Sequence, residues 1–202
     1  EMVIPVVSDG AFVFSSGRVL AVGSAGVDVV GDGHCLAFGH TTVLALGRAR
    51  VFAADQASVI ATETSFVQAV ADTRVRLLDW AVALVGERCR VDASDESRVR
   101  AFGESVVRAD GEAGVSLYGT ARVDATDRCS VSLTQQSHGS VRGACRVDVR
   151  DTASVNAYDD VHVEGSDDAR MWLSGQCSGA AHDSVTVVVS DRASVVASER
   201  ST

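Results

Sequence analysis

Four carboxylates recur every sixteen residues towards the C-terminal end of the chain: Asp151, Asp167, Asp183 and Glu199. If this spacing is that of a structural repeat, the four side chains stack in one row, and stacked carboxylates can hold Ca²⁺. The glycine-rich nonapeptide that binds Ca²⁺ in β-helical repeats does not occur, however. Aspartate is also a common turn former, because its side chain hydrogen-bonds the nearby backbone. We therefore favour turn formation for this row, and a Ca²⁺ site is the alternative.

The sequence contains no recognisable catalytic or cofactor motif. It has no phosphate-binding glycine loop, no Gly-x-Ser-x-Gly elbow and no Cys-x-x-Cys pair. Its five histidines are dispersed, so no zinc site is predicted. We expect no enzymatic activity and no cofactor.

These residues belong to a repeat of eight. Counted from Glu1, the 202 residues divide into 25 octads with two residues left over and without an insertion or deletion. Position three is Val in 19 of the 25 octads, position five is Ala, Val or Leu in 23, and position seven is Gly, Asp or Glu in 21. The period of two over positions one to five predicts a short strand with its odd residues inward. Position seven predicts the turn.

One octad cannot bury its apolar side alone, so the octads must stack. A short repeat without a helical period predicts an all-β protein, a parallel β-solenoid that runs uninterrupted over residues 1–202. Two octads per coil, or 16 residues, are favoured over three, because Ala and Val would leave a void inside a triangular coil. The general preference of crossover connections favours a right-handed coil.

Net charge and hydropathy exclude two kinds of partner. The formal net charge is -9 and the chain contains no Lys, which argues against direct binding of nucleic acid. There is no uninterrupted apolar run of the roughly 20 residues that a membrane span needs. All five cysteines lie at odd, inward positions. Their odd number and the lack of a visible signal sequence favour reduced, buried thiols and a cytoplasmic location.

The aromatic residues all lie at even positions and are therefore predicted to point outward. If octads alternate between side A, which begins with Glu1, and side B, the outward residues of side A form an apolar stripe over residues 1–86. Residues 87–202 have polar outer surfaces. The stripe is interrupted at Gln68, and its residues at positions four and six are Ile4, Leu20, Leu36, Phe52, Leu84, Val6, Val22, Phe38 and Val70.

Soluble proteins rarely leave an extended apolar patch uncovered. We therefore predict that the stripe is a homodimer face or a docking surface for a protein partner. The alternative is that another segment of the same polypeptide covers it. The predicted function is that of a rigid rod, a structural or interaction module.

The octad phase, the 16-residue coil and the small inward residues are similar to the repeat domains of bacterial ice-nucleation proteins. They are more loosely similar to the pentapeptide-repeat solenoids that mimic DNA. The resemblance implies a β-solenoid and adds two alternative functions, an acidic decoy for a nucleic-acid-binding protein and ice binding. Among outward strand positions, however, Thr occurs only at Thr42 and Thr186, so the Thr-x-Thr ladders of ice-nucleation repeats are missing.

Overall fold

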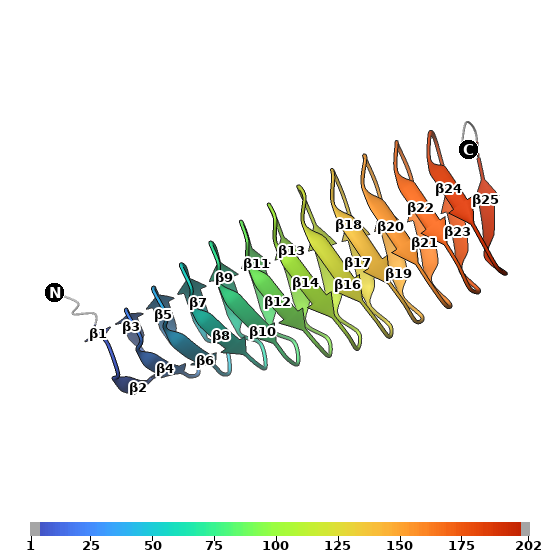
Figure 1. Ribbon diagram of the computed structural model, residues 1–202. Coiled ribbons are helices and arrows are strands. Elements are labelled where there is room, and N and C mark those ends of the chain that lie inside the picture. Colours follow the sequence, from blue (N-terminus) through green and yellow to red (C-terminus); the bar gives the residue numbers. More distant parts are fainter. Residues whose placement is uncertain (1–4, 199–202) are drawn as a thin grey trace. The chain divides into compact units, whose positions relative to one another are not determined.

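A computed structural model describes residues 5–198 of the chain, apart from the side chain of Phe12. The chain is an all-β parallel β-solenoid with two strands per coil, as the octads predict. It divides into two compact units, residues 1–99 and 100–202, and the strand β13 (Arg98–Ala101) contains the boundary between them. Each unit consists of two facing sheets, one of odd-numbered strands (sheet A) and one of even-numbered strands (sheet B) (Figure 1).

In unit 1, the strands follow one another in each sheet in chain order. Sheet A contains β1 (Val6–Val7), β3 (Arg18–Ala21), β5 (His34–Ala37), β7 (Arg50–Ala53), β9 (Phe66–Ala69) and β11 (Val82–Val85). Sheet B contains β2 (Phe12–Ser15), β4 (Gly26–Val29), β6 (Thr42–Ala45), β8 (Ser58–Ala61), β10 (Arg74–Leu77) and β12 (Arg90–Ala93).

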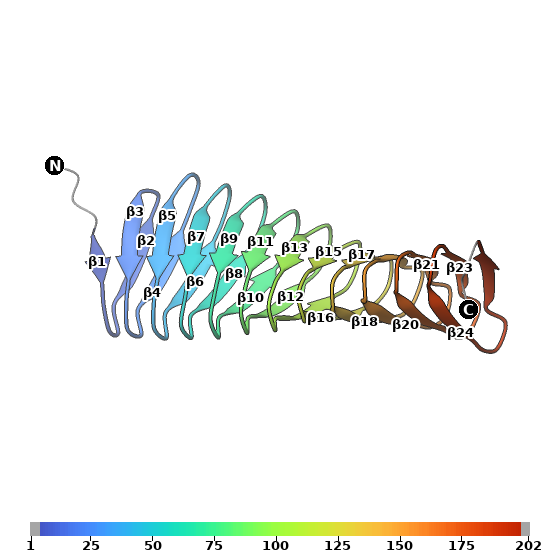
Figure 2. The same ribbon diagram turned by 90° about the horizontal axis from the view of Figure 1, so that it is seen from above.

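Unit 2 repeats this arrangement, and Figure 2 shows the turns that join its two sheets. Sheet A of this unit contains β15 (Gly114–Leu117), β17 (Ser130–Leu133), β19 (Arg146–Val149), β21 (His162–Gly165), β23 (Ser178–Ala181) and β25 (Ser194–Ala197). Its sheet B contains β14 (Val106–Ala109), β16 (Arg122–Ala125), β18 (His138–Val141), β20 (Ser154–Ala157), β22 (Arg170–Leu173) and β24 (Thr186–Val189).

From Arg18 onward each strand occupies positions two to five of its octad, and the odd positions are inward. Val51 pairs in register with Val67, sixteen residues away, and both side chains are buried. The register confirms two octads per coil. Because most inward residues are Val and Ala, the two sheets can approach closely and still fill the space between them. The few larger buried side chains are Leu77, Leu117, Leu133, Met171 and Leu173.

The octad frame is wrong for the first two octads. Val6 pairs with Leu20 and Phe12 pairs with Gly26, so these strands lie fourteen residues from their neighbours. Only two residues separate β2 from β3, whereas the other corners have four. Because the shift is an even number, it preserves which residues point inward. It moves Val6 from the predicted position-six column into the position-four row that contains Leu20.

Position seven is the corner residue that reverses the chain between the sheets. From Gly23 to Asp191, the residue at every position seven has a positive φ, in the left-handed region. Glycine enters this region without steric cost, and aspartate is enriched there among the other residues. At Gly143 (φ 83°) even alanine has no room, because an added Cβ would lie 2.7 Å from the carbonyl oxygen of Asp127. The predicted role of the Gly and Asp residues as turn formers is confirmed.

The side chains at position seven also join one coil to the next. The N–H of Glu63 donates to the Asp79 carboxylate at 3.0 Å, and the N–H of Gln135 donates to the Asp151 carboxylate at 2.9 Å. In both cases the two residues occupy the same corner in successive coils. An aspartate at position seven thus accepts a hydrogen bond from the backbone N–H of the corner residue in the preceding coil, which lies outside the strands.

Acidification is expected to weaken this contact at Asp191. Hydrogen bonds from the Ser174 hydroxyl and from the Gly175 N–H hold the pKa of Asp191 below its ordinary value. A carboxylate whose folded pKa is depressed stabilises the fold above its unfolded pKa of about 3.9 and loses this contribution as the pH falls through the folded pKa. Urea unfolding between about pH 5 and pH 2 should show a small fall in the midpoint that is reduced in Asp191→Asn, which keeps an acceptor but does not titrate. An equal fall in both proteins would contradict this role.

Candidate interaction surface and pocket

The register of sheet A in unit 1 aligns the outward side chains at position four into one row. Leu36 lies between Leu20 and Phe52 in the two neighbouring strands. Gln68 separates Phe52 from Leu84, as the sequence predicts. In order along the sheet, the row consists of Val6, Leu20, Leu36, Phe52, Gln68 and Leu84.

The corners that follow these strands contribute a second apolar row at position six. Its side chains are half-buried or, for Ala54, buried. The two rows meet where the rings of Phe38 and Phe52 lie 5.9 Å apart between centroids, tilted by 52°. We call the two rows together the apolar band; without Gln68, it consists of Val6, Leu20, Leu36, Phe52, Leu84, Val22, Phe38, Ala54 and Val70.

Eight of the nine predicted interface residues are therefore brought together, and Ile4 lies outside the described residues. Leu36 is 44% exposed and Val6 is 63% exposed, whereas the other predicted members are half-buried. Ala54 was missing from the predicted set, although its position in the octad repeat could have identified it. The outward direction predicted for the aromatic residues is also confirmed, since none with a described side chain is fully buried.

Sheet A of unit 1 has no described carboxylate on its outward strand positions. Its charged or titratable outward residues are Arg18, His34 and Arg50, all at position two. In a chain with a formal net charge of -9, this surface combines an apolar row with a neighbouring row that bears positive charge. A partner surface would therefore have to be apolar opposite the band and neutral or acidic beside it.

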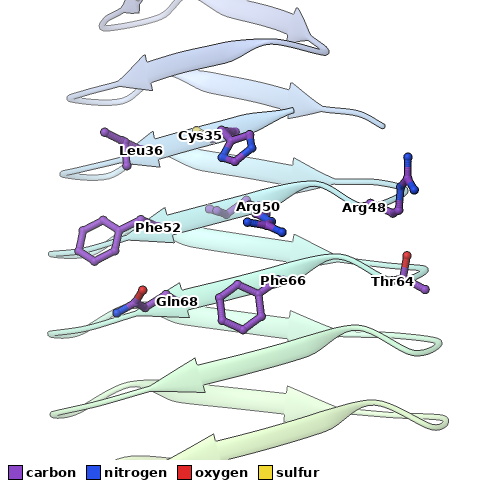
Figure 3. A pocket seen from close by; sticks show the side chains of 10 residues that line it. Cys35, Leu36, Arg48, Arg50, Phe52, Thr64, Phe66 and Gln68 are labelled. Carbon is purple, nitrogen blue, oxygen red and sulfur yellow. The ribbon is translucent and has the colours of Figure 1, made fainter. Parts of the chain in front are cut away.

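A pocket of about 700 Å³ lies on this surface, over β5, β7 and β9. Figure 3 shows Arg50 with Phe52 and Gln68 to one side and Arg48 and Thr64 to the other. The pocket is lined by His34, Cys35, Leu36, Arg48, Arg50, Val51, Phe52, Thr64, Phe66 and Gln68.

The two arginines of the pocket differ in their partners. Arg48 forms an exposed ion pair with Asp32, at 2.8 Å. Arg50 forms no ion pair with any residue in the described range 5–198. This pocket was not predicted from the sequence, although the sixteen-residue spacing of His34, Arg50 and Phe66 already places them in one row.

In unit 2 the corresponding position-four row of sheet A is polar from Ser116 to Glu164. Glu164 of this row belongs to a Ser-His-Glu grouping with two neighbouring position-two residues: His162 Nδ1 lies 2.9 Å from Ser178 Oγ, and His162 Nε2 lies 3.4 Å from Glu164 Oε1. Acyl transfer also needs N–H donors directed at the oxyanion. Here the N–H of Ser178 donates to the Val161 carbonyl, so this donor is already used by the solenoid backbone.

The predicted calcium row consists of corner carboxylates with other roles. The carboxylates of Asp151 and Asp167 accept backbone N–H groups of the preceding coil. Asp183 occupies the same corner, with a φ of 59°, and Glu199 lies outside the described residues. Among residues 5–198, no three His, Cys, Asp or Glu side chains are grouped so that they could hold a metal ion.

All five cysteines are buried, as predicted, and they are free thiols. Burial raises the pKa of the Cys35 thiol to about 12 and that of Cys89 to about 11. A thiol is nucleophilic only as the thiolate, so these two side chains behave as small apolar groups at neutral pH.

The fold places this protein in the class of parallel β-solenoids with a 16-residue coil. Comparison of the chain with protein-family models, with curated proteins and with solved structures finds no match. Within the described part of the chain, no helix has the length and apolar character that crossing a membrane requires.

Proposed function

We propose that this chain is a non-enzymatic interaction module that self-associates through the apolar band of unit 1. The observation that carries the proposal is the band itself, in which outward apolar side chains follow one another coil after coil along sheet A. Leu36 and Phe52 lie at its centre, where they are accessible to a partner.

A second copy fits the band because of its spacing. Neighbouring coils of a parallel solenoid lie about 4.8 Å apart, so the side chains of the band repeat at that distance. A partner that interdigitates with several successive side chains needs the same repeat. A second copy has it, and two sheets packed face to face lie about 10 Å apart, which leaves room for both sets of side chains.

The charges beside the band restrict the arrangement of the two copies. If the position-two rows of the two copies faced each other, Arg50 and His34 of one copy would lie opposite Arg50 and His34 of the other. The outward positions of β5 and β7 provide no carboxylate that could compensate the positive charges. A two-fold axis that runs parallel to the solenoid axis, between the position-four and position-six rows, avoids this contact. It places the position-four row of each copy opposite the position-six row of the other, so that apolar side chains face each other. The position-two rows then lie at opposite rims of the interface, where they remain hydrated.

The solution mass tests the proposal. Light scattering on a sizing column should give a dimer for the wild type and a monomer for Leu36→Asp/Phe52→Asp, because the substitution buries two carboxylates without partners in the interface. The matched control is Leu44→Asp/Ile60→Asp, which changes two outward residues that pair with each other on sheet B. It should remain dimeric. A monomeric wild type, or equal dissociation of both variants, would contradict self-association through this band.

A further inference from the structure

We propose that the pocket around Arg50 binds a carboxylate that is joined to a flat apolar group, that is, a small aryl carboxylate. Arg50 is the residue that selects the anion. Its guanidinium has no ion-pair partner among the described residues, whereas that of Arg48 is occupied by Asp32. A planar guanidinium donates two parallel N–H groups to a carboxylate, and such charge-assisted hydrogen bonds are among the strongest that a side chain makes.

The neighbours of Arg50 favour the same ligand charge. Arg50 pairs in register with His34 on one side and with Phe66 on the other. The outward strand positions of sheet A in unit 1 include no described carboxylate, so none lies beside Arg50 on these strands, and the corner carboxylate of Asp32 is already paired with Arg48. The negative net charge of the whole chain therefore does not describe this surface.

The apolar part of the ligand is selected by Phe52, Leu36 and Phe66, which line the same pocket. Phe52 lies two residues after Arg50 on β7, so both side chains point outward, with about 6.6 Å between their positions along the strand. A ligand with a short linker between ring and carboxylate can contact both. Thr64 and Gln68 add polar groups at the margin (Figure 3).

The volume is also appropriate. Ligand pockets usually measure about 300 to 1,000 Å³ and combine apolar and aromatic side chains with a few polar groups. The pocket of about 700 Å³ has this composition.

One consequence rests on the proposed function. Leu36 and Phe52 belong both to the pocket and to the apolar band, so an aryl carboxylate and a second copy of the chain compete for them. By linkage, a ligand that binds the monomer more tightly shifts the equilibrium away from the dimer. The pocket would then regulate self-association.

Calorimetric titration with 3-phenylpropionate tests the site, with the neutral 3-phenylpropanamide as the matched ligand. We expect the amide to bind at least about tenfold more weakly than the acid, because it lacks the charge that Arg50 recognises. Arg50→Gln should weaken binding of the acid by a similar factor. Arg74→Gln, at position two of β10 in sheet B, is the control and should bind the acid as the wild type does.

Two outcomes overturn the site: equal binding of acid and amide, or unchanged binding by Arg50→Gln. Light scattering at saturating acid is the second readout, and the dimer fraction should fall. An unchanged dimer fraction despite tight binding would overturn the regulatory consequence. Because the titration needs no dimer, a monomeric wild type would contradict the proposed function and would leave the result for the carboxylate site valid.

Discussion

Val67→Asp is expected to abolish the cooperative folding of unit 1. Val67 is fully buried on β9, in register between Val51 and Ala83. An aspartate there places a carboxylate among Val and Ala side chains that cannot hydrogen-bond it. An uncompensated buried charge costs several kcal/mol, a large part of the about 5–15 kcal/mol that stabilises an ordinary domain. Each coil packs only on its neighbours, so the disruption also removes the support of the adjacent coils.

An outward residue of sheet B provides the control. Ile60 points outward from β8, away from the apolar band, and Ile60→Asp is expected to change the free energy of unfolding by about 1 kcal/mol or less. Circular dichroism during thermal unfolding distinguishes the two variants. If Val67→Asp melted like Ile60→Asp, the assignment of odd residues to the interior would be wrong.

Met171→Ala is expected to lower the free energy of unfolding by about 2–4 kcal/mol, because truncation of a fully buried side chain leaves a cavity. Met171 fills space that two neighbouring glycines leave empty. A Cβ added at Gly165 would collide with Met171 Sδ, and one added at Gly179 would lie 3.4 Å from its Cε. The thioether chain is flexible enough to fill such an irregular gap.

The same geometry predicts that two unfavourable substitutions offset each other. Gly165→Ala alone should destabilise the protein, because its methyl group meets the sulfur of Met171. In the double variant Met171→Ala/Gly165→Ala the methyl group enters the cavity, so the loss should be smaller than the sum of the two single losses. Urea unfolding of the four proteins measures this coupling. Strictly additive losses would show that the two side chains do not share one space.

Most of the fold could be predicted from the sequence because the repeat has two independent periods. The alternation of Val51 and Phe52 between interior and surface follows from the period of two, and the pairing of Leu36 with Phe52 follows from the coil of sixteen. The corner residues could also be predicted, because the turn at position seven selects Gly or Asp, and these residues recur there in most octads.

The exceptions are features that depend on contacts between coils. The fourteen-residue first coil was not predicted, because a shift of two residues leaves the inward and outward alternation of Val6 and Val7 unchanged. The hydrogen bond from the Gln135 N–H to Asp151 could not be predicted, because it depends on how the corners of successive coils stack. The pocket was not predicted because His34, Arg50 and Phe66 differ in chemistry, so nothing marked their row as a site although the sixteen-residue spacing makes them neighbours.

The most direct test of the central claim is a hydroxyl-radical footprint of the wild type at several protein concentrations, since solution mass does not show which surface is covered. If the apolar band is the interface, oxidation of Phe38 and Phe52 should slow as the concentration rises and the dimer forms. Phe14, which is 67% exposed on sheet B, should react at a constant rate. Constant oxidation of Phe38 and Phe52 in a preparation that dimerises, or selective protection of Phe14, would contradict the account.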